Sequence, residues 1–279
     1  MLGLAWSELF LMLLPAMIAA EGSNLQASRY LGFDRPRALP VALGALAGLV
    51  GYLPAVALAG LWVKVLPPVL VERFPDVSRI FEGSRPEQAA VVAVAVGIAP
   101  LCEEAAFRGH LQRTLTRAAG PAVAIGLGAI LFAVRHLDPL RFAPLVLLGA
   151  VFGWLAWRGG SLWPAIAAHA ANNAVASGIA LAGPGGSRAD AAEPGAGALL
   201  AILAGGGALV VAILAAYRRA TPPPLPPEAY VVLREPADPS TRFRLGAIPE
   251  RLVRAAFVGL AALLALSLGA ALWERTAGP

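Results

Sequence analysis

Three short motifs place polar, ionisable or aromatic side chains four positions apart inside otherwise apolar segments of this 279-residue chain. They are Glu103-Glu104-x-x-x-Arg108, Phe132-x-x-x-His136 and His169-x-x-x-Asn173. Residues four apart share one face of a helix, so each motif presents its two side chains together. Ionisable groups at membrane depth are functional-site hypotheses by default. The three motifs are therefore candidates for one active site.

The two adjacent carboxylates are predicted to have different tasks. Glu104 can pair with Arg108 one turn later, whereas Glu103 is displaced by about 100 degrees around the helix and is expected to be free. A free carboxylate in a partly desolvated pocket can take a proton from water. We therefore expect Glu104 and Arg108 to fix the helix and Glu103 to act as the base.

The two histidines and the amide add the other groups that hydrolysis needs. His136 and His169 either help Glu103 to hold a water for attack on an amide, or complete with it a site for a divalent metal such as Zn²⁺. Asn173 and His169 can stabilise a developing oxyanion. Hydrolysis is the predicted reaction class, and a peptide bond is the predicted target.

Each motif also has a purely structural interpretation. The glutamates could form a salt-bridged helix end that reaches the membrane interface. His136 could be a satisfied interfacial histidine beside Asp138. His169 and Asn173 could join helices by hydrogen bonds among small neighbours. The combination favours a site, because three separate segments carry such pairs in a chain with little other polarity inside its apolar segments.

The elements that position these residues are predicted to be membrane helices. The chain is 58% hydrophobic and 14% charged, with a mean hydropathy of +0.70, which indicates an all-α, polytopic membrane helix bundle. We expect a single integral membrane domain over 1–279, with a catalytic core over 88–182. About eight transmembrane helices are expected, near 2–20, 41–63, 88–107, 121–136, 142–157, 162–182, 198–217 and 252–272. The first is expected to be retained, because Met1 to Leu14 contains no Lys or Arg.

The basic residues predict the orientation of the bundle. Fourteen of the 22 Lys and Arg fall in the first, third, fifth and seventh predicted loops, which should therefore be cytoplasmic. Both termini would lie outside, the Pro-rich loop 218–250 would be cytosolic, and Glu103 would sit near the cytoplasmic end of the third helix. Arginines in short loops beside apolar spans are expected to set topology in the cell membrane and contact lipid, not to bind nucleic acid.

In order and spacing, the three motifs resemble those of the CAAX-protease and bacteriocin-processing (CPBP, or Abi) intramembrane peptidases, which include the Ras-converting CAAX endopeptidases. The resemblance covers roughly residues 88–182. It implies an all-helical domain whose cavity opens toward the cytoplasm. It also implies that Glu103 and His136 activate water, that His169 and Asn173 form the oxyanion side, and that Glu104 and Arg108 support the site.

The resemblance leaves the cofactor and the substrate open. Members have been described as metalloproteases and as metal-independent glutamic peptidases, so the expected cofactor is none or a divalent metal such as Zn²⁺, held by Glu103, His136 and His169. A peptide or protein substrate at the cytoplasmic face, CAAX-like or a peptide precursor, is expected. The alternatives are a non-proteolytic binding, immunity or regulatory protein with the same fold, and a small-solute transporter, which would more naturally show broken helices in corresponding halves.

Overall fold

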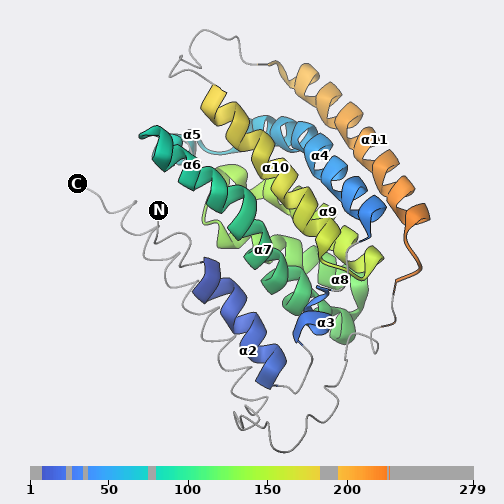
Figure 1. Ribbon diagram of the computed structural model, residues 1–279. Helices are drawn as coiled ribbons and strands as arrows, with labels where there is room; N and C mark the ends of the chain where they lie inside the picture. Colours follow the sequence, from blue (N-terminus) through green and yellow to red (C-terminus); the bar gives the residue numbers. More distant parts are fainter. Residues whose placement is uncertain are drawn as a thin grey trace, which may run out of the picture.

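The computed structural model describes residues 8–22, 27–33, 37–74, 80–182, 194–224 and 226. In these residues the regular elements are helical and there is no strand (Figure 1), which confirms the all-α class. The elements are η1 (Glu8–Leu13), α2 (Leu14–Gly22), α3 (Ala27–Leu31), α4 (Ala38–Val65), α5 (Pro68–Arg73), α6 (Arg85–Ala93), η3 (Val94–Ile98), α7 (Ala99–Glu104), η4 (Ala105–Leu111), α8 (Gln112–Arg135), η5 (Pro139–Arg141), α9 (Phe142–Gly159), α10 (Trp163–Ala182) and α11 (Ala196–Ala220).

Five helical runs in the described residues are long and apolar enough to cross a membrane, which indicates that the protein resides in one. They are Ala38–Val65, Arg85–Arg135, Pro139–Gly159, Trp163–Ala182 and Ala196–Ala220, and a shorter apolar helix spans Glu8–Ala19. The count of eight is not confirmed. The predicted helices 88–107 and 121–136 belong to one run, and the predicted helix 252–272 lies outside the described residues, as does most of the 218–250 loop.

The run Arg85–Arg135 corrects the prediction that the helix carrying Glu103 ends near residue 107. Helical structure continues through η4 into α8 as far as Gly120, where φ is 80° and ψ is 166°. Glycine adopts this left-handed φ without strain, and Pro121 suits the first position of the segment that follows. Hydropathy suggested an earlier end because of Arg108 and Arg113. Both arginines are in fact buried within the protein.

Two π-helical turns, η3 and η4, flank the short α7 that carries both glutamates. In each, a backbone N–H bonds five residues back: Ala99 to Val94 O and Gln112 to Phe107 O. Pro100 lacks an N–H and its ring conflicts with the carbonyl four residues earlier, so a wide turn just before it relieves that conflict. Such turns occur often at functional sites, because they change the direction of the side chains that follow.

Helix α4 lies between α10 and α11 (Figure 1) and packs closely on α10 through glycines. A Cβ at Gly44 would lie 2.3 Å from Pro164 O, and one at Gly48 would lie 1.8 Å from Ala168 O. Residue numbers increase in the same direction along both helices at these two contacts, so α4 and α10 run parallel. This small-x-x-x-small spacing lets membrane helices approach at backbone distance, and it fixes the position of the helix that carries His169.

The first, third, fifth and seventh predicted loops meet at one end of the bundle. Three hydrogen bonds join them: Arg113 to Gly160 O, the Leu162 N–H to Gly32 O, and Arg158 to Arg218 O. The alternation of these loops therefore agrees with the predicted order of helices. The side of the membrane on which this end lies stays a prediction from charge.

Candidate active site

The ion pair between Glu104 and Arg108 is present and deeply buried. Arg108 Nη1 lies 2.9 Å from Glu104 Oε1, and the two side chains are 2% and 0% exposed. Arg108 Nη2 also donates to Gly149 O on α9 at 3.0 Å. A buried guanidinium needs partners of this kind, since desolvation of an unpaired charge is costly. The alternative in which the glutamates reach the membrane interface is therefore wrong.

Glu103 is not free, contrary to the prediction from its helical position. Its Oε1 accepts a hydrogen bond from Arg135 Nη1 at 2.6 Å. Arg135 lies at the end of the predicted helix 121–136, and the reversal at Gly120 brings this last turn of α8 back beside α7. The other oxygen of Glu103, Oε2, is buried and has no hydrogen-bond partner. One oxygen of this carboxylate is thus anchored and the other is available.

His169 on α10 lies between the two glutamates. Its Nδ1 is 2.9 Å from Glu104 Oε1, and a carboxylate paired with an arginine can only accept, so Nδ1 carries a proton. Its Nε2 then lies 3.8 Å from Glu103 Oε2. The imidazole is stacked on Phe152, with ring centroids 5.1 Å apart and an interplanar angle of 19°. Glu104 and Phe152 therefore fix the ring so that Nε2 faces the available oxygen of Glu103.

His136 enters from the end of α8, and the ring of Phe132 connects it to the other groups. His136 Nδ1 lies 2.9 Å from Phe132 O, which can only accept, so Nδ1 carries a proton here too. The Phe132 ring centroid is 4.9 Å from that of His136, 5.7 Å from that of His169, and 4.4 Å from Arg108 Cζ. Phe132 and His136 share one side, as predicted.

Asn173 lies one turn beyond His169 on α10, and its Nδ2 donates to Ala95 O at 2.8 Å. This bond joins α10 to η3, which is the structural role considered above for this motif. An amide has a second N–H that this bond does not use. The structure thus gathers Arg108, His136 and His169 around Phe132. Glu104 joins this group through Arg108 and His169, and Asn173 binds η3, which belongs to the same helical run as the glutamates.

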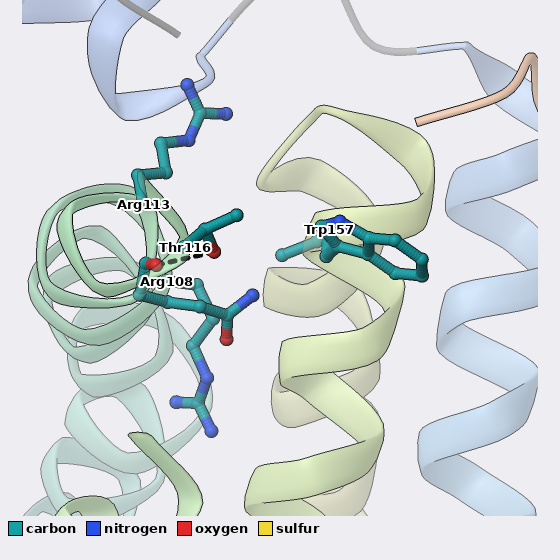
Figure 2. A pocket seen from close by; sticks show the side chains of 6 residues that line it. Arg108, Arg113, Thr116 and Trp157 are labelled. Atoms are coloured by element: carbon teal, nitrogen blue, oxygen red, sulfur yellow. Dashed lines mark hydrogen bonds between the residues drawn. The ribbon is translucent and has the colours of Figure 1, made fainter. Parts of the chain in front are cut away.

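A row of buried polar side chains continues from the site along the helix that faces α9. The row consists of Glu104, Arg108, Gln112 and Thr116. Gln112 Nε2 donates to Gly153 O at 2.8 Å, one turn after the bond from Arg108 to Gly149 O. Residue numbers thus increase in the same direction on both sides, so α9 runs parallel to this part of the helix. Figure 2 shows the small cavity beside the row, from which Arg108 and Arg113 extend in opposite directions. The bonds from Arg108 and Gln112 hold the helix that carries the glutamates against α9.

Sequence reasoning missed three residues that contact the predicted ones: Glu8, Arg135 and Phe152. Arg135 Nη2 lies 2.5 Å from Glu8 Oε1 in η1. Glu8 is the single acid of the predicted helix 2–20, and Arg135 is the single charged residue of the predicted helix 121–136 apart from His136. Both could have been found as charges within apolar segments. Phe152 carries no such signal, because an aromatic residue in an apolar helix is ordinary.

The expected metal ligands do not fit a metal in this arrangement. Among the residues that the structure describes, no group of three or more His, Cys, Asp or Glu side chains is placed to hold an ion. The guanidinium of Arg135 already occupies Glu103 Oε1, and a positive charge there opposes a divalent cation on the same carboxylate. The predicted set Glu103, His136 and His169 therefore does not form a metal centre as these side chains lie.

Fold and site together define a membrane-embedded helical protein with a buried cluster of carboxylates, histidines and arginines. Residues 85–175 match the family model described as type II CAAX prenyl endopeptidase, Rce1-like. The match spans about a third of the chain and contains all three motifs. It confirms the resemblance to the CPBP peptidases and supports a CAAX-type protease. Searches of curated proteins and of solved structures found no match.

Proposed function

We propose that the protein is an intramembrane endopeptidase that hydrolyses a peptide bond of a membrane-associated substrate with water activated by Glu103. One observation carries the proposal. The buried Oε2 of Glu103 has no hydrogen-bond partner and lies 3.8 Å from His169 Nε2. A water beside this gap can contact both atoms, and a general base must lie within hydrogen-bond reach of the proton that it takes.

The reaction consumes one water and needs no group from outside the chain. Glu103 takes a proton from the water while the water oxygen forms a bond to the carbonyl carbon, and the carbonyl π electrons move onto oxygen. When this oxyanion collapses, the C–N bond breaks and its electron pair leaves with the nitrogen. The proton held by Glu103 passes to that nitrogen, so an amine and a carboxyl group leave and the base is regenerated.

The neighbouring residues support this chemistry in separate ways. His136 follows Arg135, which binds Glu103, at the end of α8, and it would help to hold the water. The second amide N–H of Asn173 would contact the developing oxyanion. His169, which is oriented by Glu104 through Nδ1, would donate to the oxyanion as an imidazolium, with a second proton on Nε2. Glu104 and Arg108 would hold the helix and the imidazole without touching the substrate.

The substrate class follows from the family and from the charge of the bundle. The matched family is described as acting as a prenyl endopeptidase, so a CAAX-like peptide with a lipid tail is the first substrate to test, and a peptide precursor is the second. The end of the bundle that holds Arg113, Arg158 and Arg218 would face the cytoplasm of a cell-membrane protein. A cytosolic segment would reach the site from there.

The first test compares the wild type with Glu103→Gln in liposomes containing a farnesylated CAAX-type peptide. Glutamine keeps the size and hydrogen-bonding capacity of the side chain but removes the base, so cleavage should fall about 100-fold or more. Mass spectrometry locates the new carboxyl terminus. Glu82→Gln, in an exposed position, is the control and should cleave normally. Cleavage by Glu103→Gln at the wild-type rate would overturn the proposal, as would the absence of cleavage by the wild type.

The second test removes divalent metals from the wild type. A glutamate-activated water predicts that cleavage of the same peptide persists after dialysis against a chelator, with no stoichiometric metal in the protein. A bound Zn²⁺ that generates the nucleophile cannot be removed without loss of activity. Activity that returns only when Zn²⁺ is added would contradict direct activation, and would make Glu103, His136 and His169 the ligands after rearrangement.

A further inference from the structure

Glu8 is a third buried carboxylate beside the proposed active site, and it comes from an element outside the family match. It lies in η1, is 3% exposed, and contacts Arg135 through Oε1 at 2.5 Å. The same guanidinium contacts Glu103 Oε1 at 2.6 Å through its other terminal nitrogen. A single arginine thus joins the N-terminal helix to the proposed base.

The burial of Glu8 is specific to its position on an apolar helix. Met12 and Ala16, one and two turns later, are buried on the same face, whereas Leu9 and Leu11 are exposed. An unpaired carboxylate in such a place would be strongly destabilising, so the guanidinium is required to keep it there. The planar fork of arginine contacts the two carboxylates through two separate terminal nitrogens, whereas a lysine would offer one nitrogen on a flexible stem.

The sharing of Arg135 has a consequence for the base. An arginine that belonged to Glu103 alone could bind both of its oxygens and would largely neutralise it. Here Glu8 occupies the second nitrogen, so the guanidinium contacts Oε1 of Glu103 only, and Oε2 stays without a partner. Two negative charges share one positive charge, which leaves Glu103 able to accept a proton.

We propose that Glu8 is a positioning residue for peptide hydrolysis: it holds Arg135 so that Glu103 keeps one oxygen for the attacking water. This inference rests on the function proposed above. It assigns a task to the N-terminal helix, whose contacts with α7 and η4 place it along the site. Glu8 itself touches neither the water nor the substrate in this account and acts through Arg135.

The experiment measures kcat and KM of Glu8→Gln and Glu8→Asp with the farnesylated peptide in liposomes, with Glu82→Gln as the control. Glu8→Gln should lower kcat roughly tenfold to 100-fold with KM within twofold, because the base is displaced and substrate contacts are not. Glu8→Asp keeps the charge and should recover a large part of kcat. A residue that merely anchored the N-terminal helix would change the melting temperature without this split and this rescue.

Outcomes that overturn the inference differ from those that overturn the proposed function. Suppose first that Glu103→Gln is inactive, so that the function stands. The inference then fails if Glu8→Gln has the wild-type kcat, and it also fails if Glu8→Asp is as slow as Glu8→Gln. If Glu103→Gln cleaves normally, the function itself fails. Should Glu8→Gln not fold, Arg135→Lys decides: it should lower kcat at unchanged KM, and a wild-type kcat would overturn the inference.

Discussion

Two regions of the bundle hold their helices together by different interactions. Around Glu103 and Glu104, buried carboxylates contact two arginines and a histidine, and Glu103 shares Arg135 with Glu8. Between α4 and α10, glycines bring the backbones together without any charge. Lipid tails are as apolar as the helix surfaces, so hydrophobicity alone does not select helix partners in a membrane. Close packing and buried polar contacts must do so.

Helix α10 takes part in both regions through adjacent residues. Ala168 faces Gly48 of α4, and His169, the next residue, faces Glu104 of α7. Successive helical residues point about 100 degrees apart, so one helix can be packed on one side while it presents a functional group on another. The close contact with α4 thus serves as the rigid support from which His169 is held against the site.

The largest change in stability is expected when the charged region loses one partner. Arg108→Ala leaves Glu104 buried without its cation, which should cost about 3–5 kcal/mol of folding free energy. The melting temperature in detergent is the measurement. Arg141→Ala is the matched control, because the Arg141 side chain is 36% exposed in its pair with Asp138, and such pairs contribute about 0–1 kcal/mol. Equal melting temperatures for the two variants would show that the buried pair is not structural.

A smaller effect is expected in the glycine-packed region. Gly48→Ala places a Cβ against Ala168 O, so α4 and α10 must separate, at a cost of about 1–3 kcal/mol. Gly205→Ala in α11 adds the same atom where nothing lies within 4 Å, and it should be neutral or slightly stabilising because alanine favours helix. Thermal unfolding of the two variants measures the difference. If both behave alike, close approach of α4 and α10 does not limit stability.

The sequence was sufficient to predict the features that depend on neighbouring residues. Apolar runs predict helices, and four-residue spacing predicted the pairing of Glu104 with Arg108 and the common side of Phe132 and His136. It failed where distant charges meet. The contact of Arg135 with Glu103 was not predicted, because a hydropathy profile cannot distinguish a charge in water from one paired inside the protein. The reversal at Gly120 and the approach of Glu8 supply that pairing.

The central claim is that the two adjacent carboxylates have separate tasks, and one paired measurement tests it: melting temperature and peptide cleavage of Glu103→Gln and Glu104→Gln in the same preparations. Glu103→Gln should melt near the wild type, because Arg135 keeps Glu8 as a partner, and should lose cleavage. Glu104→Gln should melt well below the wild type, because Arg108 is left buried without its counter-charge. Glu103→Gln that cleaves at the wild-type rate, or that melts as low as Glu104→Gln, would contradict the account.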